Sequence, residues 1–533
     1  MHNQLHTLDY IVFALYLVIV AAYGYWIYRK KTIKSDTASG FFLAEGSLTF
    51  WAIGASLIAS NISAEHFIGM SGSGFEIGLA ISSYEWMAAA ALIVVAVFFL
   101  PVYLKNNIYT MPQFLRRRYN PLVATTMAVF WLLLYIFVNL TSIIYLGALA
   151  LEVTAGVNFT AAVIALSLFA ILITVGGMKV IGYTDVVQVV VLVVGGLITT
   201  YLALDMVSDK FGNTGILGAF VTLKEQADSH FHMVIKEDSP HYKDLPGLSV
   251  IVGAMWINNL AYWGCNQYII QRTLGADLNT ARKGILFAAF LKLLVPLIVV
   301  VPGIAAYVLH QNGMFQTEMV DAAGIVKPDK AYPVLLNLLP IGLKGVAFAA
   351  LTAAIVASLA GKANSISTIF TLDIYKLYIN KNASEKHLIR IGRWAVWISM
   401  IIAALIAPQL RVLSQAYQFI QEYSSFVSPG VLVIFMFGLF WKKATGNAAL
   451  VTAVLTIPLS VLFKFWIPEV PFLNRMAIAF FVLSIIMVVL SLTDKSEKRT
   501  PPLAMPSFNV SRSFLIISLI ICGILGALYA AFW

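Results

Sequence analysis

Long apolar stretches recur along almost the whole chain. Each runs for about 20 residues with few charges, which is the length an α-helix needs to cross a hydrocarbon layer of roughly 30 Å. About 14 such spans are predicted, beginning near residues 9, 48, 79, 122, 160, 183, 248, 283, 343, 391, 412, 444, 473 and 512. The pattern therefore predicts an all-α polytopic membrane protein. It excludes an outer-membrane barrel, whose strands show short alternating patterns instead.

Composition agrees with this pattern. Of the 533 residues, 60% are hydrophobic and 11% are charged, whereas soluble domains carry about 25% charged residues. These values exclude a soluble enzyme, a disordered scaffold and a single-span receptor with a large ectodomain. The net charge of +10 sits mostly between the spans, so we expect lipid rather than nucleic acid as the partner. Both cysteines, Cys265 and Cys522, lie in apolar segments and indicate no disulfide framework.

The distribution of positive charge predicts the topology. The first apolar run is followed by Arg29, Lys30, Lys31 and Lys34, the reverse of a cleavable signal peptide. It is therefore expected to be a retained span whose C-terminal end is cytoplasmic. With this orientation most of the 35 Lys and Arg residues fall on the cytoplasmic side, and both termini are expected outside.

Two spans are interrupted by polar residues at their middle. The second reads IGASLIASNISAEHFIGMSGSG and the seventh reads GAMWINNLAYWGCNQYIIQRT. Broken helices in corresponding positions of inverted repeats point to the central binding site of a transporter. Each interrupted span begins a set of five spans, so we predict five units along the chain. They are an N-terminal span and loop (1–47), a first repeat of five spans (48–206), an external loop (207–247), a second repeat of five spans (248–441), and three C-terminal spans (442–533).

Polar side chains concentrate on these two spans and their neighbours. They are Asn61, Ser63, Glu65, His66, Glu85, Asn139, Asn258, Asn259, Asn266, Gln267, Lys292, Gln418, Gln421 and Glu422. Amides both donate and accept hydrogen bonds, so this mixture suits a neutral polyhydroxy ligand. Each single amide could instead form an interhelical bond. His66 has no second ligand at helical spacing that would indicate a metal site.

Several strings resemble the sodium/solute symporter family, especially its bacterial sodium/galactose and animal sodium/glucose members. They are ASNISAEHFIGMSGSG, ISSYEWM, YIFVNLTSIIYLG, YWGCNQYIIQRTL, FAAFLKLLVP, FTLDIYK and QFIQEYSSFVSPG. The resemblance implies a LeuT-like five-plus-five inverted repeat. It also implies sodium-coupled uptake of a monosaccharide such as glucose or galactose by alternating access, in a bacterial inner membrane. A sodium ion and a small sugar are then the expected partners, with no enzymatic activity and no organic cofactor.

The resemblance also assigns residues. The implied sugar-binding residues are Asn61, His66, Glu85, Asn259, Lys292 and Gln421. The implied outer gate is formed by Met70, Tyr84 and Tyr417, and the inner gate by Tyr262. The implied sodium ligands are the carbonyls of Ala59, Ile62 and Ala354 and the hydroxyl of Ser358.

Three positions depart from the family pattern. His66 replaces a glutamine and Ala88 a serine of the bacterial galactose carrier, so the particular sugar stays open. At the sodium site the family has two adjacent serines, where this chain has Ala357 and Ser358.

Lys362 lies four residues after Ser358, on the same helical face. Its side chain is expected to lean back toward that hydroxyl, with Asp185 as a candidate counter-charge. The alternative to sodium coupling is therefore a sodium-independent or proton-coupled carrier in which Lys362 replaces the ion. The sequence also leaves open a related polyol as the substrate, as well as a membrane-embedded enzyme, a channel or a sugar sensor.

Overall fold

The computed structural model describes residues 6–29, 48–174, 177–212, 215–320, 324–337, 339–412, 416–495 and 503–533. Three lysines of the expected cytoplasmic cluster, Lys30, Lys31 and Lys34, lie outside these ranges. Within them the chain is almost entirely helical, and the β-structure consists of an isolated bridge between Val320 and Val326. The predicted all-α class is confirmed.

The helices of the first half and their bounds are α1 (Thr7–Arg29), α3 (Phe50–Asn61), η1 (Glu65–Met70), α4 (Ser71–Glu76), η2 (Leu79–Ser82), α5 (Ser83–Val94), η3 (Val95–Phe99), α6 (Leu100–Lys105), α7 (Met111–Arg118), α8 (Pro121–Leu133), η4 (Leu134–Leu140), α9 (Thr141–Ala155), α10 (Phe159–Thr174), α11 (Gly177–Phe211), α12 (Gly215–Gln226) and α13 (Gly247–Ser249). Those of the second half are α14 (Met255–Cys265), α15 (Gln267–Leu274), α16 (Leu278–Gln311), α17 (Ala331–Asn337), α18 (Leu343–Thr368), η9 (Ile369–Ile379), α19 (Glu385–Ile406), α20 (Ala416–Ser425), α21 (Ser428–Phe440), α22 (Gly446–Trp466), α23 (Phe472–Thr493) and α24 (Arg512–Ala531).

Among the described residues, 11 helices are long and apolar enough to cross a membrane, or 12 if one bent pair counts as a span. The bent pair is Tyr417–Ser425 with Ser428–Phe440, which meet at 45°. Two predicted spans correspond to the shorter helices α3 and α10. The multi-pass architecture is confirmed, whereas the count of about 14 stays a prediction.

Both predicted interruptions are present. Helix α3 ends at Asn61, and Ile62 is extended (φ −73°, ψ 121°) before the chain resumes helical structure in η1. Helix α14 ends at Cys265, and Asn266 is extended (φ −95°, ψ 127°) before α15. Helical hydrogen bonding therefore lapses twice in the interior, where only protein or a wet cavity can satisfy the released groups.

Small residues allow the interior helices to approach closely. A Cβ on Gly54 of α3 would lie 2.7 Å from the Gly284 carbonyl of α16, and one on Gly303 of α16 would lie 2.1 Å from the Ser71 carbonyl of α4. Close backbone contact between small residues is a main source of helix association in membranes. Helices α16 and α18 are buried along most of their length, whereas α1, α23 and α24 expose apolar side chains.

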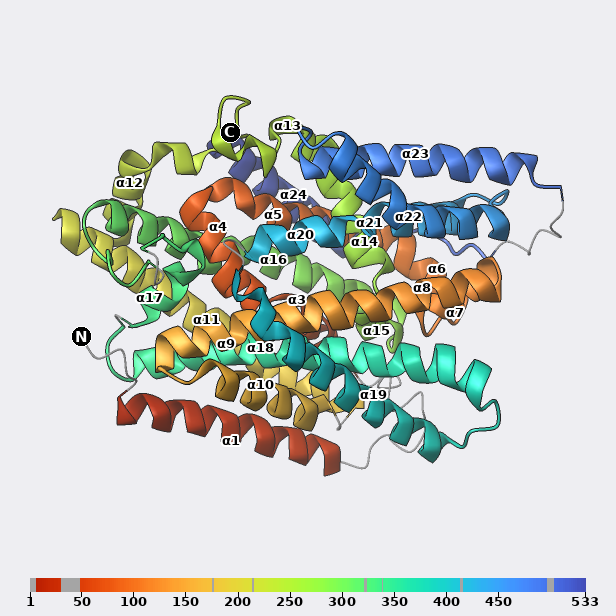
Figure 1. Ribbon diagram of the computed structural model, residues 1–533, viewed down its shortest axis with the longest axis horizontal. Coiled ribbons are helices and arrows are strands. Elements are labelled where there is room, and N and C mark those ends of the chain that lie inside the picture. The colour runs from red at the N-terminus through yellow and green to blue at the C-terminus, as the bar shows by residue number, and fades with distance from the viewer. Residues whose placement is uncertain are drawn as a thin grey trace.

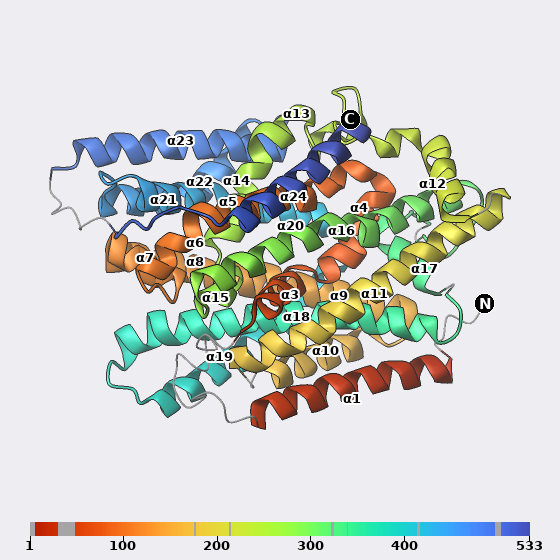
Figure 2. The same ribbon diagram turned by 180° about the vertical axis from the view of Figure 1, so that it is seen from behind.

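Most long helices run along the long axis of the molecule, with α1 at one edge and α23 at the opposite edge (Figure 1). Both termini lie toward the end where α12 is found, and α7 lies at the other end (Figures 1 and 2). Hydrogen bonds attach both termini there: Met233 N donates to Phe532 O (2.6 Å), and Gly342 N donates to Asp9 Oδ1 (2.7 Å). The placement of both termini outside the membrane stays a prediction.

Candidate functional site

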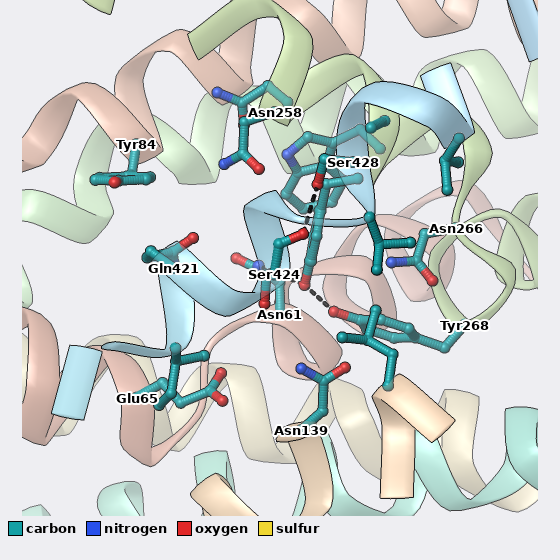
Figure 3. A pocket seen from close by; sticks show the side chains of 18 of the residues that line it. Asn61, Glu65, Tyr84, Asn139, Asn258, Asn266, Tyr268, Gln421, Ser424 and Ser428 are labelled. Atoms are coloured by element: carbon teal, nitrogen blue, oxygen red, sulfur yellow. Dashed lines mark hydrogen bonds between the residues drawn. The ribbon is translucent and has the colours of Figure 1, made fainter. Parts of the chain in front are cut away.

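One cavity is enclosed by the two helix breaks and the helices beside them (Figure 3). All six residues assigned to sugar binding line it: Asn61, His66, Glu85, Asn259, Lys292 and Gln421. They come from α3, η1, α5, α14, α16 and α20, so residues far apart in the sequence meet at a single place. Their role in binding stays a prediction, but their convergence is a feature of the structure.

Glu85 is at the centre of a buried network. Its carboxylate accepts hydrogen bonds from the Lys292 ammonium and, at 3.3 Å, pairs with His66 Nε2. Lys292 also donates to Asn61 Oδ1 and lies 5.0 Å from the centre of the Trp263 ring. A buried charge requires such compensation. The Glu85–Lys292 pair is thus neutral overall, and with His66 and Asn61 the network joins four of the six assigned side chains.

Both His66 ring nitrogens already have protein partners. Ser63 N donates to Nδ1 at 3.4 Å, which leaves the proton on Nε2, facing Glu85. His66 therefore positions Glu85. A direct bond from this ring to a sugar would require one of the two contacts to open.

Two other polar groups of the cavity have no hydrogen-bond partner in the part of the chain that the structure describes. Asn259 Nδ2 and the Tyr84 hydroxyl are buried and make no hydrogen bond with the described residues. An unpaired buried donor costs about 1–3 kcal/mol. A ligand with acceptor oxygens placed against these two atoms would remove this penalty.

The gate residues divide into two groups. Tyr84 and Tyr417 line the cavity and pack edge to face with ring centres 5.6 Å apart, both buried. Tyr262 also lines it, and its hydroxyl accepts from Asn61 Nδ2 at 2.9 Å and contacts the hydroxyl of Tyr268. Met70, in contrast, is buried at the end of η1 and is not among the described lining residues.

The expected sodium region lies where α18 passes the end of α3. Ser358 Oγ donates to the Ser60 carbonyl at 3.0 Å, and Lys362 Nζ donates to Ser358 Oγ at 3.1 Å. The predicted contact between Lys362 and Ser358 is therefore confirmed. Ala357 supplies no side-chain oxygen. Of these two adjacent positions, Ser358 alone therefore provides a hydroxyl group.

The expected pairing of Asp185 with Lys362 is wrong. Asp185 Oδ2 accepts from Ser56 Oγ at 2.5 Å and lies 3.9 Å from Arg272 Nη2. Arg272 in turn packs against Gly361, where a Cβ would lie 2.5 Å from its Nη2. The spacing of residues along α18 placed Lys362 beside Ser358, but it did not indicate that Arg272 of α15 would be the cation that reaches Asp185.

Several lining residues were not expected from the sequence: Trp131, Tyr268, Ser424, Ser428 and Lys362 itself. Tyr268 lies two residues after the break at Asn266, so its position beside the cavity could have been predicted from that break. Trp131 had none, because aromatic residues in membrane helices are more often interface anchors.

Comparison with known proteins supports the same picture. Residues 41–455 match the model of the sodium:solute symporter family. The chain is 46% identical over 541 residues to a sodium/glucose cotransporter of Vibrio parahaemolyticus, covering all of this chain and 99% of that protein. It is 34% identical over 464 residues to sodium/myo-inositol cotransporter 2 of Oryctolagus cuniculus, covering 83% of this chain and 67% of that protein.

A solved structure has the same fold. It is a Na⁺-coupled sialic acid symporter, superimposed with a TM-score of 0.79 at 22% identity and covering 93% of this chain and 99% of its own. The similarity confirms the LeuT-like helical architecture that the family resemblance implied. With the family match over most of the sequence, it shows that this chain belongs to the sodium:solute symporter family.

Proposed function

We propose that this protein carries a monosaccharide, a hexose such as glucose or galactose, together with sodium by alternating access. The observation that supports this most is the cavity between the two broken helices. It combines amides, a compensated carboxylate and unpaired donors, as a ligand rich in hydroxyl groups requires. The Vibrio relative named for sodium and glucose points to the same substrate class.

The site assignments follow from this proposal. The sugar is bound by Asn61, His66, Glu85, Asn259, Lys292 and Gln421, with Tyr84 and Tyr417 as its outer gate and Tyr262 as its inner gate; all of these residues line the cavity. Sodium binds where α3 ends, at the carbonyls of Ala59, Ile62 and Ala354 and the hydroxyl of Ser358. The protein lies in a bacterial inner membrane with both termini outside, and the repeats occupy 48–206 and 248–441.

A polyol such as an inositol is the second candidate substrate, because relatives at 34% identity are named for myo-inositol. Purified protein in liposomes should take up labelled glucose when sodium is present outside and not when choline replaces it. Unlabelled galactose, mannose and myo-inositol then compete at a fixed excess. Sodium-dependent uptake of labelled glucose supports the proposal, sodium-dependent uptake of labelled myo-inositol without uptake of any hexose supports the polyol, and uptake of neither class rejects both.

A further inference from the structure

Lys362 of α18 lies beside the end of the broken helix α3. Lys362 is 2% exposed, deep in a helix whose neighbouring residues are also buried. Its ammonium donates to Ser358 Oγ, which donates to the carbonyl of Ser60 in the last turn of α3. The three groups form one chain from the cation to the helix end.

The end of α3 attracts positive charge. The last helical bond runs from Ile62 N to Ile58 O at 2.8 Å, so the carbonyls of the final turn lack intrahelical partners. These carbonyls carry the negative end of the helix dipole, and half-helix C-terminal ends are the usual ligands of coupling ions in transporters. A cation is therefore favoured at the end of α3, and the protein itself supplies one in the ammonium group of Lys362.

Carboxylates near Lys362 are engaged elsewhere. Glu65 lines the same cavity, but its oxygens accept from Ser142 (2.6 Å) and Ser63 (3.3 Å). Asp185 contacts Arg272. No carboxylate of the described residues forms an ion pair with Lys362, whose ammonium instead lies 5.1 Å from the centre of the Tyr268 ring.

We propose that the Lys362 ammonium is a tethered cation that competes with the transported sodium ion for the Ser358 hydroxyl, and so sets the sodium affinity of the carrier. The proposal rests on the proposed function. It identifies a residue that determines ion affinity, and it predicts that a neutral side chain at position 362 strengthens sodium binding.

Geometry and charge both produce the competition. A hydroxyl has two lone pairs and one proton, and Ser358 already uses its proton and one lone pair. An ion bound to the remaining lone pair at an oxygen-ligand distance would lie within about 6 Å of Nζ. Two like charges this close repel strongly in a site of low dielectric, so sodium binds only as the ammonium moves away.

The test compares two methionine variants on the same helix. Lys362→Met keeps the length of the side chain and removes the charge, whereas Lys344→Met makes the same change at the start of α18, away from the cavity. The sodium concentration that gives half-maximal sugar uptake is measured for both and for the wild type. We expect Lys362→Met to lower it by at least about tenfold and Lys344→Met to leave it unchanged. An unchanged or higher value in Lys362→Met overturns the proposal.

Sodium binding without transport separates this proposal from the proposed function. Stabilisation of the purified protein against heat is measured over a sodium titration, with choline as control, for the wild type, Lys362→Met and Lys362→Gln. Tighter sodium stabilisation in either folded variant supports the competition even if no sugar is transported. If the wild type transports sugar without sodium and Lys362→Met becomes sodium-dependent, the proposed coupling fails while the role of Lys362 stands. Equal stabilisation by sodium in all three proteins contradicts the proposal that Lys362 competes with sodium.

Discussion

The polar residues of the cavity differ in how many of their hydrogen bonds the protein already makes. Glu85, Lys292 and Asn61 are joined to one another, so removing one exposes the others to an uncompensated buried charge or dipole. Asn259 Nδ2 and the Tyr84 hydroxyl have no described partner. Truncating a connected residue therefore affects folding and binding together, whereas truncating an unpaired one affects binding alone.

Asn259→Ala separates these effects. It should leave thermal stability near that of the wild type, because no described bond of Nδ2 is lost, and weaken sugar binding about 5–150-fold, because a buried bond of 1–3 kcal/mol to the ligand disappears. The matched control is Asn337→Ala on α17, whose amide donates to Val153 O at 3.0 Å. The control should lose stability and keep its sugar affinity. Equal sugar affinity in Asn259→Ala and the wild type would remove this residue from the site.

His66→Gln tests whether the ring selects among hexoses. Glutamine cannot hold Glu85 at the same distance while accepting from Ser63 N, so the carboxylate should shift. The ranking of glucose, galactose and mannose in competition assays is expected to change more than the maximal rate of uptake. An unchanged ranking would show that His66 does not influence sugar choice.

Residue-level prediction succeeded where the chemistry was unusual for its surroundings. Amides and charges at the middle of apolar spans are rare enough to indicate a site, and all six assigned sugar residues do line one cavity. The partner of Asp185 and the role of Trp131 could not be predicted, because both depend on which helices become neighbours.

At the scale of elements, the breaks in α3 and α14 give the molecule its site. Both were predictable, since runs of polar residues at mid-membrane are incompatible with an uninterrupted lipid-facing helix. The bend of 45° between α20 and α21 was not predicted. In retrospect Pro429, in the first turn of α21, was its signal, because proline favours a helix start.

Close helix packing is the element-level property that can be tested most directly. Gly303→Ala would place a Cβ 2.1 Å from the Ser71 carbonyl, which is backbone and cannot rotate away. We expect α16 to move away from α4 and the protein to lose about 1–3 kcal/mol of stability. The loss should appear as a lower temperature at which half of the protein has aggregated, measured by size-exclusion chromatography after heating. Gly523→Ala on α24, where the new Cβ meets nothing within 4 Å, should match the wild type. A wild-type midpoint for Gly303→Ala would mean that α16 and α4 are not packed this closely.

At the scale of the whole molecule, both termini lie toward the same end of the long axis (Figures 1 and 2). The positive charges predict that this end is external. Alkaline phosphatase fused after Trp533 should therefore be active in bacteria, and the same enzyme fused after Asn382, between η9 and α19, should be inactive. The reverse pattern would invert the topology without changing the fold.

The central claim is that the cavity binds a sugar whose movement is driven by sodium. Liposomes containing the purified protein are given an inward sodium gradient and a trace of labelled hexose, and the internal sugar concentration is followed over time. The account predicts transient accumulation above the external concentration, abolished when choline replaces sodium and when Gln421 is changed to alanine. Uptake that never exceeds equilibrium, or that is the same in choline, would contradict it.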